Sequence, residues 1–272
     1  MLHNAALALQ GQDVVYVPLL VDDLAAFLAS SPFNTADFHG FSVTIPHKQT
    51  ALLCCDEVRP LARKPPSSLT KRHQVDPLAR SIGAVNTLVR RDDGSLKGYN
   101  TDCTAALNAI EAGLGCSISG KSILVVGAGG AGRAIAFGAI FRGARVMIAN
   151  RTDERAAELA RDVTARHVLW SDLQDGKVQA DVLANTSAAG MQPDVDGTPV
   201  PAAALSQFSV VFDAVYTPLE TRLLREAAAA GCTPVNGVEM FVGQAAEQFQ
   251  LFTGMAPPVD TMRDVVLKSL GS

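Results

Sequence analysis

The sequence predicts an α/β protein made of two parts, the second of which is a doubly wound parallel sheet. Two observations lead to this fold class. From Lys121 onwards, short apolar runs alternate with segments of helical periodicity, as expected where helices connect parallel strands. The first of these runs, residues 122–126, is continuously apolar and leads directly into a glycine-rich turn. Such a run is typical of a parallel strand buried on both faces.

The elements of the second part follow in regular order. After the first strand we expect helices and strands in alternation, and finally a group of helices. The expected helices cover residues 130–142, 153–162, 220–230, 239–252 and 260–270, and the expected further strands cover residues 145–149, 180–185 and 210–215. This order predicts a doubly wound sheet.

The first part also alternates short β runs with helices. We expect strands at residues 13–21, 40–45, 84–91 and 95–99, and helices at residues 22–30, 47–55 and 102–112. The Asp92-Asp93-Gly94 sequence between the last two strands is a strong hairpin signal. Residues 113–120 contain three glycines and are a plausible joint between the two parts.

The composition argues against a nucleic-acid-binding, membrane-spanning or metal-binding protein. The chain has 272 residues, of which 48% are hydrophobic and 18% charged, and its net charge is −4. That charge gives no electrostatic reason to bind nucleic acid or an anionic membrane. The five cysteines show no metal-binding spacing, so we expect reduced thiols and no metal. No membrane-length apolar run or targeting segment is visible, so we expect a soluble, intracellular protein.

The glycine-rich turn predicts a dinucleotide site of the Rossmann type. Residues 127–132 read Gly-Ala-Gly-Gly-Ala-Gly directly between a strand and a helix. Gly127 permits the tight turn, Gly129 lets the backbone approach a pyrophosphate, and Gly132 allows close packing of helix and strand. The start of the helix offers free N–H groups to the phosphates. The alternative is a purely structural glycine turn.

The end of the next expected strand favours NADP over NAD. Where an NAD site usually has a carboxylate, this chain has Asn150-Arg151-Thr152. Arg151 can pair with a 2′-phosphate and stack on adenine. The alternative is that Arg151 is an ordinary solvated surface residue.

Two ionisable residues are candidates for the chemistry. Lys48 and Asp102 each stand just past a β-like run where the chain turns into a helix. They can meet at the mouth of a cleft and move a proton while a redox cofactor moves a hydride. Burial would lower the pKa of the lysine and a neighbouring carboxylate would raise it, so the spacing does not fix its value. The alternatives are a surface lysine and an aspartate that only caps a helix.

Six ordered motifs resemble those of the shikimate dehydrogenases. They are FSVTIPHK, IGAVNTLV, GYNTD, GAGGAGRA, NRT and NGVEMFVGQA, and the resemblance covers nearly the whole chain outside residues 59–75. If residues 54–58 were followed directly by residues 76–80, the sequence would look like the plant form of the family. In that form the dehydrogenase is the second half of a bifunctional dehydroquinate dehydratase/shikimate dehydrogenase. The resemblance implies NADP-dependent, reversible reduction of 3-dehydroshikimate to shikimate.

The resemblance also implies roles for individual residues. Lys48 and Asp102 are the implied catalytic pair. The implied substrate-binding residues are Thr44, Asn86, Thr101, Tyr216, Gln244 and Gln248, and polar side chains suit a polyhydroxy acid. The implied NADP-binding residues are Gly127, Gly129, Gly130, Ala131, Gly132, Asn150, Arg151, Thr152, Val215, Gly237 and Met240. Met240 could equally be ordinary core packing. Thr101 within GYNTD resembles the shikimate-type site, with quinate dehydrogenase activity as the alternative.

A domain division follows from the resemblance. It implies a substrate-binding catalytic domain over residues 1–112, an NADP-binding domain over residues 113–238, and helices at residues 239–272 that return to the first domain. The implied partners are a small-molecule substrate and a dehydroquinate dehydratase domain in a longer gene product. The implied location is the plastid stroma in a plant and the cytoplasm otherwise.

The sequence departs from the family pattern in two places. It begins with Met1-Leu2-His3-Asn4, so we expect the substrate domain to lack its first strand and the Ser-x-Ser-Pro segment that resembles the carboxylate-binding element. Residues 59–75 are an insertion, rich in proline and basic residues and flanked by a near-repeat. We interpret it as a solvated loop from altered splicing or a gene-model error, with a basic lid as the alternative. Impaired activity, or a non-catalytic dinucleotide-binding isoform, is the second functional class.

Overall fold

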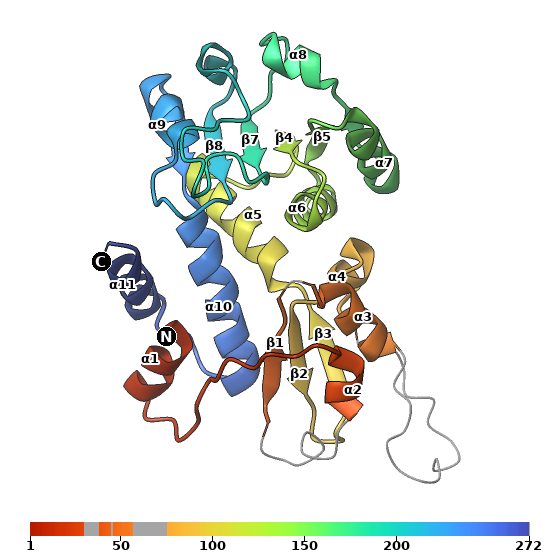
Figure 1. Cartoon of the computed structure of the whole chain (residues 1–272), viewed down its shortest axis with the longest axis vertical. Helices are drawn as coiled ribbons and strands as arrows, with labels where there is room; N and C mark the ends of the chain where they lie inside the picture. The colour runs from red at the N-terminus through yellow and green to blue at the C-terminus, as the bar shows by residue number, and fades with distance from the viewer. Residues whose placement is uncertain (30–37, 45, 57–74, 272) are drawn as a thin grey trace.

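The protein contains two separate β-sheets, which lie at opposite ends of the molecule (Figure 1). The computed structural model describes residues 1–29, 38–44, 46–56 and 75–271. The larger sheet is six-stranded and parallel, in the order β6-β5-β4-β7-β8-β9, and the smaller sheet is three-stranded and antiparallel, in the order β1-β2-β3. The predicted two-part α/β fold is therefore confirmed.

The larger sheet matches the predicted alternation of strands and helices. Its strands are β4 (Ser122–Val126), β5 (Arg145–Ala149), β6 (Arg166–His167), β7 (Val182–Asn185), β8 (Val210–Asp213) and β9 (Thr233–Val235). In register, Val126 is paired with Ala149 on one side and with Asn185 on the other. The carboxyl ends of the central strands thus share one edge. The chain order reverses between β4 and β7, and ligands bind at such a point in open α/β sheets.

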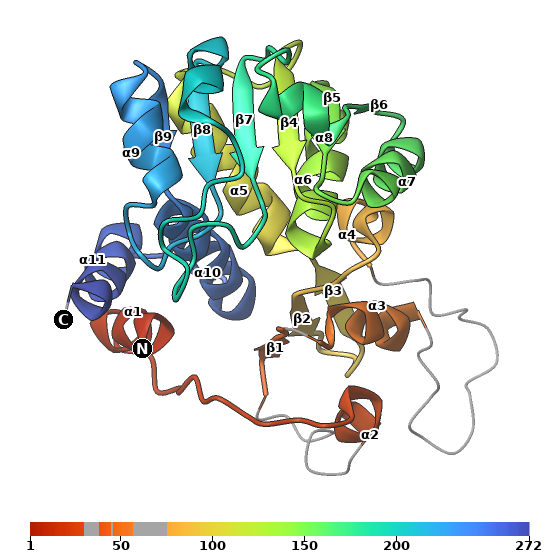
Figure 2. The same cartoon turned by 45° about the horizontal axis from the view of Figure 1, so that its top comes forward.

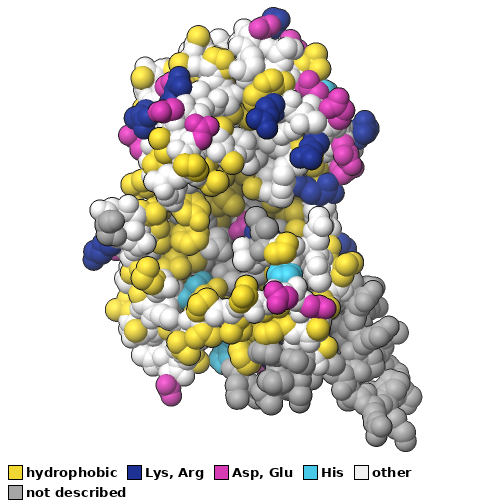
Figure 3. All heavy atoms as spheres, in the orientation of Figure 1, with side chains coloured by type: hydrophobic (Ala, Val, Ile, Leu, Met, Phe, Trp, Pro, Cys, Tyr) yellow, Lys and Arg dark blue, Asp and Glu magenta, His cyan; other side chains and the backbone are white. Residues whose placement is uncertain are grey.

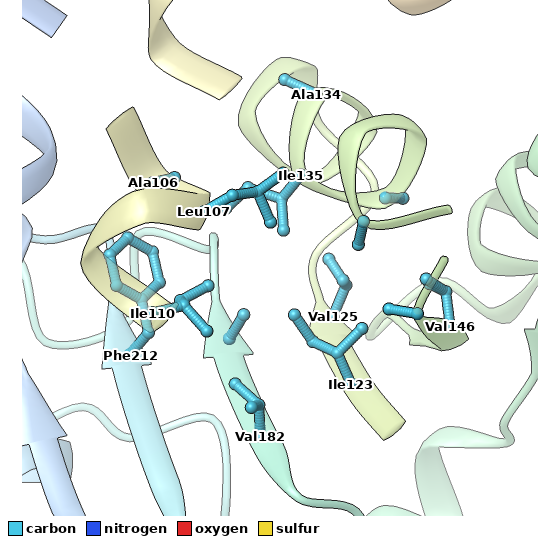
Figure 4. Packing of buried hydrophobic residues seen from close by; sticks show 14 of the residues in the cluster. Ala106, Leu107, Ile110, Ile123, Val125, Ala134, Ile135, Val146, Val182 and Phe212 are labelled. Atoms are coloured by element: carbon cyan, nitrogen blue, oxygen red, sulfur yellow. The ribbon is translucent and has the colours of Figure 1, made fainter. Parts of the chain in front are cut away.

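Helices cover both faces of this sheet (Figure 2). One face packs against α5 (Thr101–Leu114), α6 (Gly130–Phe141) and α7 (Asp153–Val163). The other packs against α8 (Trp170–Gln174), the 3₁₀ helix η2 (Ala202–Gln207) and α9 (Arg222–Ala229). Figure 4 shows the first of these cores, in which Leu107 faces Ile135 and Ile110 lies beside Phe212. All four side chains are fully buried.

The smaller sheet contains β1 (Gly40–Ser42), β2 (Thr87–Arg90) and β3 (Leu96–Tyr99), with α2 (Leu24–Ala29), α3 (Lys48–Asp56) and α4 (Pro77–Ile82) around it. The predicted hairpin is confirmed, because β2 and β3 pair across a turn in which Gly94 has φ +76°. Asp23 accepts a hydrogen bond from Ala26 N at 3.0 Å, as expected for the start of α2. The predicted insertion lies outside the described residues except for Val75, which bridges to Gly98.

One predicted strand is wrong. Residues 13–21 form no strand, although their composition is that of one. The side chains of Val15 and Leu20 are 71% and 97% exposed. A strand exists only where a neighbour accepts its backbone hydrogen bonds, and in the described part of the chain β1 pairs with β2 alone. The apolar composition of these residues predicted a strand, but composition carries no information about whether a neighbouring strand is available to pair with it.

Two long helices connect the sheets. Helix α5 begins directly after β3 and packs its buried side against the larger sheet. Helix α10 (Gly237–Thr253) follows β9 and runs alongside α5 towards the smaller sheet (Figure 1). Helices α1 (Leu2–Leu9) and α11 (Val259–Leu270) pack on the outer side of α10. None of the helices in the described residues combines the length and apolar character needed to cross a bilayer.

Candidate active site

Lys48 and Asp102 form an ion pair that joins the start of α3 to the first turn of α5. Lys48 Nζ donates to Asp102 Oδ2 at 2.7 Å, and the two side chains are 31% and 18% exposed. Lys48 is the first residue of α3, and its carbonyl accepts a hydrogen bond from Val85 N at 2.9 Å. That backbone contact holds the start of α3 beside the segment that leads into β2. The surface of the molecule is hollowed between the two parts (Figure 3).

The cap of α5 explains the position of Asp102. Asn100 is the N-cap: its Oδ1 accepts from Cys103 N at 3.1 Å, and its Nδ2 donates to the Ala84 carbonyl at 3.1 Å. The alternative in which Asp102 merely caps the helix is therefore wrong. Asp102 lies in the first turn, where the helix dipole favours a negative charge, and its carboxylate is directed at Lys48.

A buried polar cluster lies next to the ion pair. Thr101 N donates to Asn86 Oδ1 at 2.9 Å, and Asn86 Nδ2 donates to Thr101 Oγ1 at 3.0 Å. Thr87 Oγ1 also donates to Asn86 Oδ1, at 2.9 Å. All three residues are 2% exposed or less. Buried polar groups are costly unless paired, so these mutual bonds fix the orientation of each side chain.

Gln248 extends this cluster to α10. Its side chain is 2% exposed; its Oε1 accepts from Ser42 Oγ at 2.7 Å and its Nε2 donates to Thr87 Oγ1 at 3.0 Å. Gln248 was predicted from its position one helical turn after Gln244, whereas Ser42 was not predicted. Because side chains alternate along a strand, Ser42 shares a face with Thr44, and that alternation could have revealed it.

His3 is a second residue that the sequence analysis missed. It is 5% exposed and stacks on Tyr16, with ring centroids 4.4 Å apart. Burial lowers the pKa of the His3 imidazole to about 4, while a hydrogen bond with Gln248 acts in the opposite direction. A neutral imidazole therefore lies behind the Gln248 amide. Only its place at the start of a helix marks it in the sequence.

The remaining substrate candidates are less buried than this cluster. Thr44 and Tyr216 are exposed, and Gln244 is partly buried. The Tyr216 ring stacks on Phe241 with centroids 5.1 Å apart, and Gln244 Nε2 donates to the Phe241 carbonyl at 3.1 Å. Phe241 thus supports two of the candidates from α10.

The glycine loop is shaped for a ligand that approaches its backbone. Gly127 has φ +110°, and a Cβ there would lie 2.6 Å from Thr186 Oγ1. A Cβ on Gly132 would collide with the Gly127 carbonyl, whereas Gly129 and Gly130 face open space. Helix α6 begins with Gly130-Ala131-Gly132 and has no side-chain cap. Its first N–H groups are therefore available to an anion, and the observed shape fits a pyrophosphate.

The residues after β5 divide into two kinds. Asn150 accepts from Ala128 N at 3.2 Å and donates to the Thr152 carbonyl at 3.0 Å, so its amide holds the loop together. Arg151 and Thr152 are exposed, and Arg151 makes no ion pair within the described residues. An unpaired guanidinium beside an uncapped helix start is suited to a phosphate.

Val215, Gly237 and Met240 lie where α10 begins. Val215 is 6% exposed. A Cβ on Gly237 would lie 2.6 Å from the Ala214 carbonyl oxygen and 2.8 Å from that of Val215, so only glycine allows this approach. Met240 packs against the core beneath the larger sheet, which agrees with the core-packing alternative.

The sequence matches three family models. They are the shikimate dehydrogenase substrate-binding domain over residues 1–65, shikimate/quinate 5-dehydrogenase over residues 109–196, and the shikimate 5′-dehydrogenase C-terminal domain over residues 237–267.

Individual relatives resemble the whole chain. It is 47% identical to the chloroplastic bifunctional 3-dehydroquinate dehydratase/shikimate dehydrogenase of Arabidopsis thaliana, over 98% of this chain but only 43% of that protein. It is 41% identical to the NADP⁺ shikimate dehydrogenase of Methanosarcina barkeri, over 99% of this chain and 92% of that protein. The structure of Thermus thermophilus shikimate 5-dehydrogenase in complex with NADP(H) and shikimate superimposes with a TM-score of 0.79 at 34% identity, covering 99% and 93% of the two chains. The chain therefore belongs to the shikimate dehydrogenase family.

Proposed function

We propose that this protein catalyses the NADP-dependent, reversible reduction of 3-dehydroshikimate to shikimate. The observation that carries the proposal is the 2.7 Å ion pair of Lys48 and Asp102, in a chain that also contains the buried polar cluster at Thr101 and the glycine loop of the larger sheet. Membership of the shikimate dehydrogenase family supports the same reaction.

NADPH would be held by the larger sheet. The open space at Gly129 and Gly130, together with the uncapped start of α6, fits the pyrophosphate. Arg151 and Thr152 would bind the 2′-phosphate, with Asn150 holding the loop. Val215, Gly237 and Met240 would border the nicotinamide, which supplies the hydride when the cofactor is bound. The full set of proposed contacts is Gly127, Gly129, Gly130, Ala131, Gly132, Asn150, Arg151, Thr152, Val215, Gly237 and Met240.

Lys48 would deliver the proton. As hydride reaches the carbonyl carbon, the C=O π electrons move to oxygen, and the oxygen takes a proton from Nζ. The reverse reaction returns that proton to Nζ. Asp102 Oδ2 holds the ammonium group in position, and Oδ1 makes no hydrogen bond within the described residues, which leaves it able to accept one from a substrate hydroxyl.

The polar cluster would recognise the other substrate groups. We propose that Thr44, Asn86, Thr101, Tyr216, Gln244 and Gln248 surround the ring. Asn86 and Thr101 are already fixed by mutual hydrogen bonds, and preorganised polar groups discriminate against substrates that leave them unpaired. Thr101 favours shikimate over quinate, which carries an additional hydroxyl group.

The two sheets support the proposed division of labour. Residues 1–112 would bind substrate, residues 113–238 would bind NADP, and residues 239–272 would return to the substrate domain through Gln248, which contacts both β1 and β2. We also propose that a longer gene product joins this chain to a dehydratase domain, as in the Arabidopsis relative. The location would be the plastid in a plant and the cytoplasm otherwise.

A substrate comparison tests this proposal. The expected result is oxidation of NADPH with 3-dehydroshikimate, reduction of NADP⁺ with shikimate, and much slower reduction with quinate. Equal or faster turnover of quinate would identify a quinate dehydrogenase instead. NADPH binding by calorimetry without turnover of any of these compounds would identify a non-catalytic dinucleotide-binding protein.

A further inference from the structure

Asp213 is a buried carboxylate to which the proposed reaction assigns no role. It is the last residue of β8 and is fully buried. Its Oδ1 accepts hydrogen bonds from Asn185 Nδ2 at 2.9 Å and from Val215 N at 3.1 Å, and its Oδ2 accepts from Thr221 Oγ1 at 2.7 Å. Burial raises the pKa of this carboxyl, and the three hydrogen bonds oppose that rise. Desolvating a carboxylate is costly, so its retention here needs an explanation.

The first partner, Asn185, forms hydrogen bonds that hold a loop against the glycine turn. Asn185 Oδ1 accepts from Ser187 N at 3.0 Å and from Ser187 Oγ at 2.7 Å. Between them, Thr186 donates to the Val126 carbonyl from its N at 2.8 Å and from its Oγ1 at 2.9 Å. Thr186 Oγ1 is also the atom that a Cβ on Gly127 would strike. Residues 185–190 are therefore held directly against the glycine turn.

The second and third partners control the loop that carries Tyr216. Val215 N is fixed by Asp213 itself, and Thr221 accepts from Leu224 N at 3.3 Å, which caps α9. Asp213 thus binds both ends of the segment 215–221. This segment contains Val215, which faces Gly237 at the start of α10, and Tyr216, which stacks on Phe241.

The end of the first loop and the residues just after it also contact the second loop. A Cβ on Gly190 would lie 3.6 Å from Thr221 Cβ, and Gln192 N, two residues beyond the loop, donates to the Thr217 carbonyl at 3.2 Å. Asn185, Asp213 and Thr221 are all fully buried, so water cannot replace these hydrogen bonds. We call these three residues the Asp213 cluster.

We propose that Asp213 is a positioning residue that fixes residues 185–190 and 214–221 relative to each other, so that the glycine turn and Tyr216 are aligned for hydride transfer. A carboxylate serves this purpose because Oδ1 accepts from Asn185 and Val215 while Oδ2 accepts from Thr221. An asparagine would accept only through one uncharged oxygen and would present an NH2 group, which cannot accept, where Thr221 Oγ1 now donates, so the attachment of both loops should weaken. The catalytic part of this inference rests on the proposed function, whereas the positioning of the loops does not.

Hydrogen–deuterium exchange tests the positioning without requiring turnover. Asp213→Asn is compared with wild type at peptides that cover residues 185–190 and 214–221, with the peptide of β5 as an internal reference. The expected result is faster exchange in both loops and unchanged exchange in β5. Unchanged exchange in the two loops, or acceleration throughout the larger sheet, would overturn the proposal.

Kinetics test the consequence for catalysis. In Asp213→Asn and in the nearly isosteric Thr221→Val we expect kcat to fall by about 10- to 100-fold, and the dissociation constant of NADPH to change by less than about threefold. The deuterium isotope effect on kcat, measured with NADPH labelled at the transferred position, is expected to rise because hydride transfer becomes slower. Thr221→Ser keeps the hydroxyl and is expected to retain the activity and isotope effect of wild type.

The outcomes separate the two proposals. Wild-type kcat and isotope effect in Thr221→Val would overturn the positioning role, as would equal losses in Thr221→Ser and Thr221→Val. A loss of melting temperature and kcat with an unchanged isotope effect would also overturn it, since that indicates a purely structural residue. If Asp213→Asn does not fold, Thr221→Val decides both measurements. A wild-type chain without turnover would overturn the proposed function, and exchange would still test the loops.

Discussion

Ser42 and Gln248 are separated by 206 positions in the sequence, and Ser42 Oγ donates a 2.7 Å hydrogen bond to Gln248 Oε1. This bond connects the edge of the smaller sheet to α10, and the second bond of the same amide, to Thr87, connects α10 to the central strand. This side of the smaller sheet is therefore held by a helix that begins at the larger sheet.

Replacing Ser42 with alanine should expose the cost of leaving that amide unpaired. A buried acceptor without a donor costs about 1–3 kcal/mol, so Ser42→Ala should lower the free energy of unfolding by about that amount and raise the KM for shikimate. Urea unfolding and steady-state kinetics would measure both. Ser42→Thr keeps a hydroxyl and serves as the control, and an unchanged free energy in Ser42→Ala would contradict the prediction.

Removing either member of the ion pair should abolish most of the activity. Positioned proton transfer contributes roughly 10²- to 10⁴-fold to rate, so Lys48→Ala and Asp102→Ala should each lower kcat by about that factor. Lys177→Ala is the matched control, because Lys177 is an exposed lysine that pairs with Asp172 and Asp175. Comparable loss in the control, or none in Lys48→Ala, would argue against the assignment.

Arg151 should determine the preference for the phosphorylated cofactor. Hydrogen bonds to charged groups contribute about 1.5–3 kcal/mol, so Arg151→Ala should weaken NADPH binding by roughly 10- to 150-fold and leave NADH binding unchanged. Titration calorimetry with both cofactors measures the difference. Arg161, in the last turn of α7, provides the control substitution. Equal loss of affinity for NADPH and NADH would show that Arg151 does not read the 2′-phosphate.

Two glycines of the same loop should respond differently to alanine. A Cβ on Gly132 collides with the Gly127 carbonyl, while a Cβ on Gly130 meets nothing within 4 Å. Overpacking of this kind costs about 1–3 kcal/mol, so Gly132→Ala should lower the melting temperature and Gly130→Ala should not. Thermal unfolding without cofactor distinguishes them, and equal melting temperatures would contradict the observed packing.

His3 should make the protein less stable in acid. The folded-state pKa is about 4 against an ordinary value of 6.5, so the unfolded chain binds more protons between these values. The contribution of neutral His3 to the free energy of unfolding is fully present above pH 6.5. It is lost as the pH falls towards 4, by about 3 kcal/mol in all. Glu247 has the opposite sign, since burial and Asp76 raise its pKa to about 7.

The His3 contribution is therefore read as a difference between variants. His3→Phe keeps a ring over Tyr16, and its free energy of unfolding, measured from pH 7 to pH 4, should fall less steeply than that of wild type. His39→Phe, at an exposed position, should follow the wild-type slope. Parallel curves for wild type and His3→Phe would show that His3 does not titrate as described.

The elements that could be predicted are those whose sequence pattern lies within the element itself. Parallel strands buried on both faces are largely apolar runs, so the strands around Val125 and Ile148 were predicted with the bounds that the structure has. The glycine turn was predictable for the same reason, because its glycines follow a characteristic spacing within a few residues. Residues 13–21 have strand composition but no partner in the described structure, and composition cannot reveal whether a partner exists.

The candidate site was predictable only where a motif marked it. Lys48 and Asp102 follow β-like runs, and their contact agrees with that placement. Ser42, His3 and Asp213 were missed because their roles arise from contacts with residues far away in the sequence. Asn100 was missed as the cap of α5 because two neighbouring residues could also begin a helix, and only the backbone geometry separates them.

Helix α5 has a mechanical consequence for the reaction. Asp102 lies in its first turn, and Ile110, eight residues further along, is fully buried beneath the larger sheet. At about 1.5 Å per residue these positions are about 12 Å apart. The carboxylate that pairs with Lys48 is therefore on a helix whose other end is packed in the core of the larger sheet. A substitution that leaves a cavity at Ile110 should loosen this packing and slow proton transfer at Lys48, whose partner Asp102 is about 12 Å from the substitution along the helix.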